Sequence, residues 1–227
     1  RPDIETITGE HTMVVSLLNG VDSEELIGQR IGMEHMIYSL IRIASHRIGN
    51  SIHFSLPKGY NGIYIGIPNQ PACQDPRLAA IAEIFADTPV TLHLSDDILL
   101  DMWDKFGLNV SRNLPQAILG VGIGVYDDSI YADAIMRRMR HEVVLVANAK
   151  GIPLTDEFKA AKWLPSQRYS TLQDLDAHRH TEIDMFSGAL IRMGKEVGVE
   201  CPYNEMTYNL IKALEEKNDG RFAYTGE

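Results

Sequence analysis

Cysteine is almost absent from this chain, which contains only Cys73 and Cys201 among its 227 residues. Two cysteines cannot build a disulfide framework, and neither has a second cysteine at the C-x-x-C spacing that metal sites use. We therefore expect both to be free, reduced thiols in a cytoplasmic protein. Long apolar runs are missing too, since none approaches the ~20 residues that a membrane helix needs, and there is no signal-peptide pattern. No membrane partner is expected.

Positive charge is also scarce, with 21 lysines and arginines against 31 aspartates and glutamates and a formal net charge of -10. Non-specific nucleic-acid binding relies on a basic surface, so this balance argues against a nucleic-acid partner. The rest of the composition, 44% hydrophobic and 23% charged, is ordinary for a globular protein. The length fits one large domain or two modest ones.

Familiar glycine and histidine motifs are missing as well. The glycines at 120, 122 and 124 have the wrong spacing for the G-x-G-x-x-G dinucleotide fingerprint, and we interpret them as a break between two helices. No P-loop sequence occurs. His178 and His180 are two residues apart, so on a helix they point about 200° apart and cannot chelate one metal ion. We propose no metal site.

Strand patterns occur only in the first part of the sequence. Short apolar runs bounded by turn residues predict strands at 12–18, 36–44, 51–56, 62–67 and 89–94, with a turn at Gly49-Asn50. A helix is expected to start near Ser23, and another to cover 75–86, with Asp75 as its N-cap and Pro76 at its first position. This mixture of strands and helices is typical of an α/β layer.

After residue 95 the pattern becomes helical. Helices are predicted at 96–113, where Pro115 interrupts the pattern, and at 126–149, 156–162, 170–197 and 204–217. We therefore predict two domains: an α/β domain formed by residues 1–95 and an all-helical domain formed by residues 96–227.

The stretch from Ser170 to Asp184 combines a predicted helix start with two charged residues on a helical face that is otherwise apolar. Ser170 followed by Gln173 is a capping-box pattern. An apolar stripe at helical spacing then comprises Leu172, Leu175, Phe186, Leu190, Met193 and Val197. On a continuous helix, Arg179 and Glu182 fall within that stripe. Charges there are costly unless they are paired or used, so they form either an internal ion pair that fixes helix packing or part of a site.

A second row of polar side chains lies on another predicted helix. Lys105, Asn109 and Asn113 are spaced i, i+4, i+8, in line with the apolar Ile98 and Met102. The lysine could extend to solvent, and the amides could form a helix–helix polar network. Alternatively, an ammonium and two amides suit a small ligand that carries carboxylate and hydroxyl groups. If the two helices meet, a desolvated lysine beside Glu182 could serve as a general acid.

Four segments, in this order along the chain, together resemble the ketopantoate reductases (2-dehydropantoate 2-reductases). They are L-N-G at Leu18 to Gly20, W-D-K-F-x-x-N-x-x-x-N from Trp103 to Asn113, S-T-L-Q-D-L-x-A-x-R-x-T-E-I-D from Ser170 to Asp184, and the stretch from Ser187 to Asn204 that ends in a Pro-x-Asn turn. They span nearly the whole chain, so the combination is far more specific than any one motif.

The resemblance implies a partial NADP-binding Rossmann domain followed by a helical domain like that of 6-phosphogluconate dehydrogenase, with the active site between them. It implies that NADPH delivers hydride to a small 2-keto acid in pantothenate synthesis, in a homodimer. The roles that it implies are general acid for Lys105, orientation of lysine and substrate for Glu182, substrate binding for Asn109, Asn113 and Ser170, and cofactor contact for Asn19.

This sequence departs from the family pattern in two places. Where many relatives carry Asn-Gly, ten residues past the second helix asparagine, this chain has Ile123-Gly124. One substrate contact is therefore replaced, and a D-2-hydroxyacid dehydrogenase that acts on a branched or aromatic 2-keto acid is the alternative. The family's opening strand and Gly-rich turn, roughly 80 residues of a mononucleotide-binding half, have no counterpart before Arg1. We expect weak NADPH binding by this chain alone, and a non-catalytic helical dimerisation remnant is the third possibility.

Overall fold

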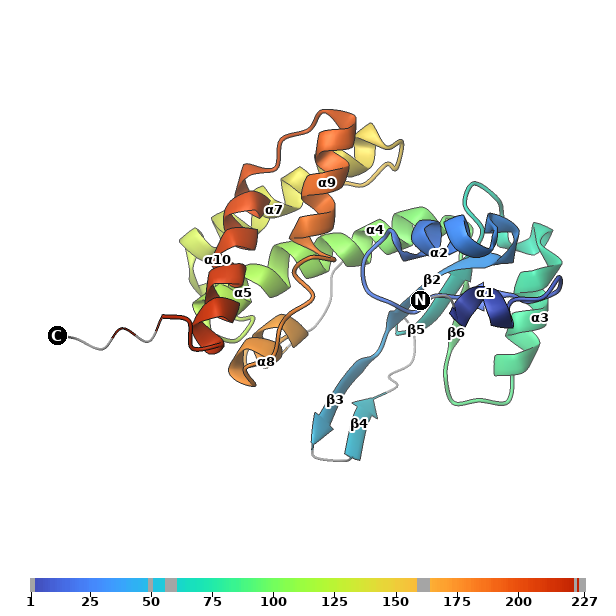
Figure 1. Ribbon diagram of the computed structural model, residues 1–227, viewed down its shortest axis with the longest axis horizontal. Coiled ribbons are helices and arrows are strands. Elements are labelled where there is room, and N and C mark those ends of the chain that lie inside the picture. The colour runs from blue at the N-terminus through green and yellow to red at the C-terminus, as the bar shows by residue number, and fades with distance from the viewer. Residues whose placement is uncertain (1–2, 49–50, 56–60, 159–163, 223, 225–227) are drawn as a thin grey trace. The chain divides into compact units, whose positions relative to one another are not determined.

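The structure, a computed structural model, describes residues 3–48, 51–55, 61–158, 164–222 and 224. Two compact units divide the chain, Arg1–Met102 and Trp103–Glu227. The first contains strands and helices, and the described residues of the second contain helices without strands (Figure 1). An α/β unit is thus followed by a helical one, as the sequence predicted.

The first unit is built on a four-stranded sheet in the order β1-β2-β5-β6. Its strands are β1 (Val14–Val15), β2 (Met36–Arg42), β5 (Gly62–Gly66) and β6 (Leu92–Leu94). β1 pairs parallel with β2, β2 antiparallel with β5, and β5 parallel with β6. Strands β3 (Ala44–Ile48) and β4 (Ser51–Ser55) form a separate antiparallel hairpin. The turn predicted at Gly49-Asn50 lies outside the described residues.

Helices α1 (Asp3–Ile7), α2 (Ser23–Ile31) and α3 (Pro76–Phe85) and the short turns η1 (Met33–His35) and η2 (Ala72–Gln74) complete the first unit. Helix α3 begins as predicted, because the Asp75 side chain accepts a hydrogen bond from the backbone N–H of Arg77 at 2.9 Å. Leu78 and Ile81, one turn apart on α3, pack against Ile37 and Ile65 of the sheet. This apolar layer is the core of the first unit.

The second unit begins within α4 (Ile98–Leu108), which continues as the π-helical turn η3 (Asn109–Asn113) and then as α5 (Leu114–Leu119). The interruption predicted at Pro115 is therefore wrong, because the chain remains helical. Proline has no N–H for the usual helical hydrogen bond, and the wider π turn immediately precedes it. Within this turn, the Ser111 hydroxyl donates to the Gly107 carbonyl at 2.6 Å.

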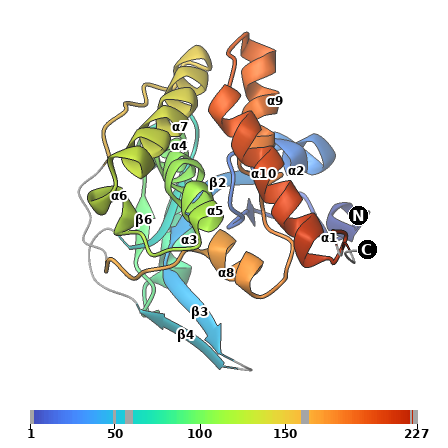
Figure 2. The ribbon, with the colours of Figure 1, turned by 90° about the vertical axis from the view of Figure 1, so that its left-hand side faces the viewer.

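The remaining helices are α6 (Val125–Asp128), α7 (Ile130–Ala149), α8 (Ser170–Asp176), α9 (Ser187–Val197) and α10 (Pro202–Asn218), several of which are seen from the side in Figure 2. The predicted helix 126–149 is divided, because Ser129 caps α7 by accepting from the Ala132 N–H. Residues 156–158 of the predicted helix 156–162 are not helical, and 159–163 lie outside the described residues.

The predicted helix 170–197 is also divided. Helix α8 stops at Asp176, and His178 follows with a left-handed φ of 52°, which turns the chain away from the helix axis. The Arg179 N–H then folds back onto the Asp174 carbonyl at 2.8 Å. The apolar stripe is nevertheless buried at Leu172, Leu175, Phe186, Leu190 and Met193, because two shorter helices and their connection pack it inward.

Candidate functional site

The π turn brings together two of the predicted site residues. Asn113 is buried and Asn109 is half-buried, and the Asn113 Nδ2 donates to the Asn109 Oδ1 at 3.3 Å. This bond uses one donor of one amide and one acceptor of the other. The pair therefore keeps an N–H₂ group and a carbonyl oxygen whose positions are mutually fixed.

Lys105 lies one helical turn before Asn109, in the last turn of α4. Its side chain is half-buried, whereas Ile98 and Met102, earlier on the same helical face, are buried. An ammonium and two amides thus follow one another along the helix, with Lys105 and Asn109 half-buried and Asn113 buried. Their catalytic and binding roles stay predictions.

Ser170 is the first residue of α8, and its side chain is exposed. The predicted capping box is wrong, because Tyr169 is the N-cap and the Gln173 side chain donates to the Arg168 carbonyl at 2.7 Å. The buried amide of Gln116 holds the chain that leads to Ser170. Its oxygen accepts from the Tyr169 N–H at 2.9 Å, and its nitrogen donates to the Gln167 carbonyl at 2.8 Å.

Glu182 and Arg179 do not share a helical stripe, because both lie in the connection between α8 and α9. Arg179 is exposed and bonds to the Asp174 carboxylate at 2.7 Å and 2.9 Å. Glu182 is half-buried, and its carbonyl accepts from the N–H groups of Met185 and Phe186. The premise that a continuous helix buries both charges is therefore wrong, and Glu182 owes its partial burial to a folded loop.

Asn19 belongs to the first unit and is half-buried in a bend after β1. Hydrogen bonds close the loop that carries it. The hydroxyl groups of Ser16 and Ser23 lie 2.9 Å apart, and Ser23 also donates to the Glu24 carboxylate at 2.8 Å. Burial raises the pKa of the Glu24 carboxyl, which is 1% exposed. This network joins the two ends of the loop that carries Asn19, and the loop follows β1, which pairs in parallel with β2.

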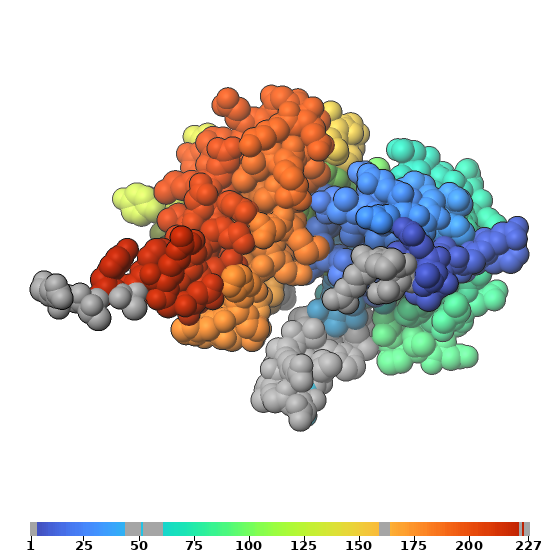
Figure 3. All heavy atoms as spheres, viewed as in Figure 1, coloured from blue at the N-terminus to red at the C-terminus, as the bar shows by residue number. Residues whose placement is uncertain are grey.

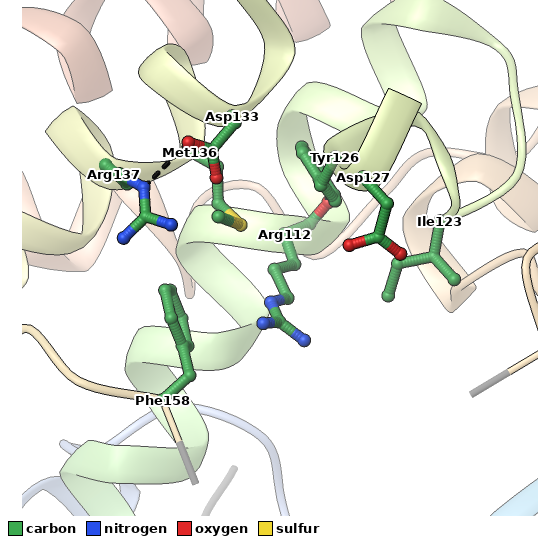
Figure 4. A pocket seen from close by; sticks show the side chains of 8 residues that line it. All are labelled: Arg112, Ile123, Tyr126, Asp127, Asp133, Met136, Arg137 and Phe158. Carbon is green, nitrogen blue, oxygen red and sulfur yellow. Dashed lines mark hydrogen bonds and ion pairs between the residues drawn. The ribbon is translucent and has the colours of Figure 1, made fainter. Parts of the chain in front are cut away.

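A pocket of about 110 Å³ in the second unit is lined by charged and apolar side chains from α6, α7 and the π turn, with Phe158 facing Arg112 (Figure 4). The Arg112 guanidinium lies 4.3 Å from the Phe158 ring centroid, and burial lowers the pKa of Arg112. Arg137 pairs with Asp133 at 2.7 Å. None of the predicted site residues lines this pocket, so it is distinct from the Lys105–Asn109–Asn113 row.

Three buried polar residues that support the second unit were not predicted. Gln116 and Glu215 anchor segments next to Ser170 and Glu182, and Glu142 receives the N–H groups of Tyr203 and Asn204 at the start of α10. A carboxylate at a helix N-terminus is favourable because it pairs with unsatisfied N–H groups. Each is a polar residue on an amphipathic helix, where polar residues usually face water, so residue type and spacing do not reveal its burial.

Among the described residues, no group of three or more His, Cys, Asp or Glu side chains is placed to hold a metal ion. The described helices also include none long and apolar enough to cross a membrane. His180 instead contacts the Asp219 carboxylate, with its Nε2 at 3.0 Å.

Comparison with known proteins places this geometry in a family. Residues 97–215 match the family described as Ketopantoate reductase PanE/ApbA C terminal, and residues 1–70 match Ketopantoate reductase PanE/ApbA. The 2-dehydropantoate 2-reductase of Caulobacter vibrioides is 28% identical over 218 residues, which cover 92% of this chain and 71% of that relative.

Two solved structures have the same fold. The PanE/ApbA family ketopantoate reductase from Ralstonia eutropha JMP134 superposes with a TM-score of 0.79 at 24% identity, over 95% of this chain and 71% of that one. D-mandelate dehydrogenase with NADH and anilino(oxo)acetate superposes with a TM-score of 0.81 at 24% identity, over 96% and 72%. The predicted fold class, a partial Rossmann-type α/β domain followed by an all-helical domain, is confirmed. The chain belongs to the ketopantoate reductase family, a family of oxidoreductases.

Proposed function

We propose that this protein reduces 2-dehydropantoate (ketopantoate) to pantoate with NADPH, in the cytoplasm, as a step of pantothenate and coenzyme A synthesis. The observation that carries the proposal is the Lys105–Asn109–Asn113 row, in which two amides are hydrogen-bonded to each other at 3.3 Å one turn beyond a half-buried lysine. The family and the curated relative support the same reaction.

The proposed chemistry assigns a task to each polar group. The nicotinamide, when bound, supplies hydride to the keto carbon. Lys105 donates a proton to the oxygen as negative charge grows there, and Glu182 orients the lysine and the substrate hydroxyl. Asn109, Asn113 and Ser170 bind the carboxylate and hydroxyl groups. Asn19 contacts the cofactor, because dinucleotides bind beyond the carboxyl ends of strands in open α/β sheets.

Replacing the proton donor tests this assignment. In the product of the full open reading frame, Lys105→Ala should lower kcat for ketopantoate by about 10²- to 10⁴-fold, the usual contribution of a positioned general acid. The measurement is NADPH oxidation followed at 340 nm. Lys150→Ala, which removes the lysine at the C-cap of α7, is the control and should leave kcat unchanged. Equal activity of Lys105→Ala and wild type would refute the role.

The alternative substrate is another 2-keto acid, reduced to a D-2-hydroxy acid by the same residues. Ile123 favours it, because this side chain is 2% exposed and packs with Tyr126, Ala132 and Met136, so it offers the substrate no hydrogen bond. A panel of ketopantoate, a branched and an aromatic 2-keto acid decides between them. A higher kcat/KM for the aromatic or branched acid would replace ketopantoate as the substrate.

We also propose that the protein works as a homodimer, which light scattering of the purified protein tests through its mass. The competing possibility is a non-catalytic protein whose helices serve only for pairing. Absence of NADPH or NADH oxidation with every acid of the panel, together with a dimeric mass, would favour that possibility over the enzyme.

A further inference from the structure

Helix α10 holds the connection between α8 and α9, residues 177–186, which contains Glu182. This connection consists of turns rather than a helix, so no regular pattern of helical backbone hydrogen bonds fixes it. Side chains of α10 contact it before and after Glu182. Figure 3 shows the atoms of α10 in red against the orange atoms of the preceding segment.

The contact before Glu182 is made by Glu215. Its Oε1 accepts from both the backbone N–H and the hydroxyl group of Thr181, at 2.7 Å and 2.8 Å. Glu215 is 3% exposed, so little water competes for this carboxylate. Charge-assisted hydrogen bonds of this kind are stronger than neutral ones and fix direction as well as distance. The residue that precedes Glu182 is therefore held at two atoms.

The contact after Glu182 is made through Asp184. Tyr208 donates to its Oδ1 at 2.7 Å, and the Lys212 ammonium lies 3.0 Å from its Oδ2. These two donors hold the pKa of the Asp184 carboxyl below its usual range. Lys212 also donates to the Glu215 Oε2 at 3.2 Å. One ammonium thus joins the anchors on the two sides of Glu182.

Packing of buried residues adds to these contacts from α10. Ile183, directly after Glu182, is 0% exposed, and its N–H donates to the Thr181 hydroxyl at 3.2 Å. Gly188 lets the Tyr208 ring approach, since a Cβ there would lie 3.2 Å from the Tyr208 Cε2. The backbone at 182 therefore has fixed neighbours on both sides, while the Glu182 side chain itself is only half-buried.

We propose that Glu215 is a positioning residue, which fixes the direction in which Glu182 is presented to the substrate. This inference rests on the proposed function, in which Glu182 orients Lys105 and the substrate. Catalytic groups must be held within about 0.5 Å of their productive positions, and a misplacement of about 1 Å can cost roughly 10²-fold in rate. The contact with Thr181 supplies that restraint from a helix that carries none of the proposed reacting groups.

The test compares four variants of the full-length protein. Glu215→Ala removes both bonds to Thr181 and should lower kcat about 10- to 100-fold, with the KM of the cofactor unchanged. Glu215→Gln retains an acceptor for Thr181 and should restore most of kcat. Thr181→Val keeps the backbone bond to Glu215 but removes the hydroxyl group, with its bonds to Glu215 and to the Ile183 N–H, and should cause a smaller loss. Glu216→Ala, the adjacent carboxylate on α10, is the control and should behave as wild type.

A double variant separates positioning from loss of structure. If Glu215 acts through Glu182, Glu182→Gln/Glu215→Ala should be no slower than Glu182→Gln alone, because coupled residues are not additive. Amide hydrogen exchange of the peptide covering 177–186 should accelerate in Glu215→Ala and not in Glu216→Ala. Additive losses of kcat, or unchanged exchange, would overturn the inference. If Glu215→Ala does not fold, full activity of Thr181→Val would overturn it.

The same assays distinguish the two proposals. A wild-type protein that reduces no 2-keto acid overturns the proposed function, and the positioning role falls with it. An active wild type that is disabled by Lys105→Ala but unaffected by Glu215→Ala keeps the proposed function and overturns only the role of Glu215.

Discussion

The two cysteines occupy opposite environments. Cys73 is exposed in the first unit, and Cys201 is buried at the start of α10 in the second. Burial, with a smaller effect from the nearby carboxylates of Glu142 and Glu205, raises the pKa of the Cys201 thiol to about 12. The thiolate is the nucleophile in alkylation and disulfide exchange, so Cys201 is protonated and unreactive at neutral pH.

We therefore predict that one thiol per chain reacts with a chromogenic disulfide reagent at pH 8, and two react in guanidinium. Cys73→Ser should abolish the native reaction, and Cys201→Ser should leave it intact. At pH 9 the Cys201 thiol should still not react in the folded protein, because it remains protonated there. Two thiols that react in the folded protein at equal rates would contradict this assignment.

Residue spacing identified some of the polar groups and missed others for a physical reason. Asn109 and Asn113 were found because amides at successive turns interrupt a face that is otherwise apolar. Glu215 and Gln116 were missed because polar residues on an amphipathic helix usually face water. Their burial depends on segments more than 30 residues distant in sequence, which no local pattern encodes.

At the scale of elements, the glycines after α5 permit a close backbone approach. The N–H groups of Ile123 and Gly124 donate to the carbonyls of Gln167 and Pro165 at 3.0 Å and 2.9 Å. A Cβ at Gly122 would lie 2.3 Å from the Pro165 carbonyl oxygen. As predicted, these glycines lie between two helices, α5 and α6. They also allow residues 165–167, which lead to Ser170, to pack closely against this connection.

We predict that Gly122→Ala lowers the free energy of unfolding by about 1–3 kcal/mol, the range for forcing extra atoms into a packed site. Gly9→Ala is the matched control, because its nearest atom to a new Cβ is 3.8 Å away, and it should be neutral or slightly stabilising. Urea unfolding of both variants measures the difference. Equal unfolding midpoints for Gly122→Ala and wild type would show that the 165–167 segment yields without cost.

Element type was more predictable than element continuity. The strands at 36–42 and 62–66, the helix α3 with its Asp75 cap and the final helix α10 all form where apolar period and end signals agree. The break after Asp176 was not visible, because Leu172, Leu175 and Phe186 keep helical spacing across it. The spacing of apolar residues indicates which side chains are buried. A continuous helix and two helices joined by a turn at His178 bury the same side chains, so the spacing does not distinguish them.

At the scale of the whole molecule, the candidate residues divide between the two units. Asn19 lies in the first unit, whereas Lys105, Asn109, Asn113, Ser170 and Glu182 all belong to the second. The resemblance to the ketopantoate reductases predicted which unit each candidate residue belongs to, because the four motifs occur in the same order along this chain as in the family. It could not supply the supporting contacts, which arise within each unit from long-range packing.

This division predicts that cofactor binding and substrate turnover are separable by mutation. In the full-length protein, Asn19→Ala should weaken NADPH binding roughly fivefold, which corresponds to about 1 kcal/mol for one lost hydrogen bond. Asn109→Ala should leave the Kd of NADPH unchanged and lower kcat/KM for the 2-keto acid, because its amide belongs to the helical unit. Titration of NADPH fluorescence measures the first quantity and steady-state assays the second. Equal loss of NADPH affinity in both variants would mean that Asn109 serves the cofactor, and the substrate would then need another set of donors.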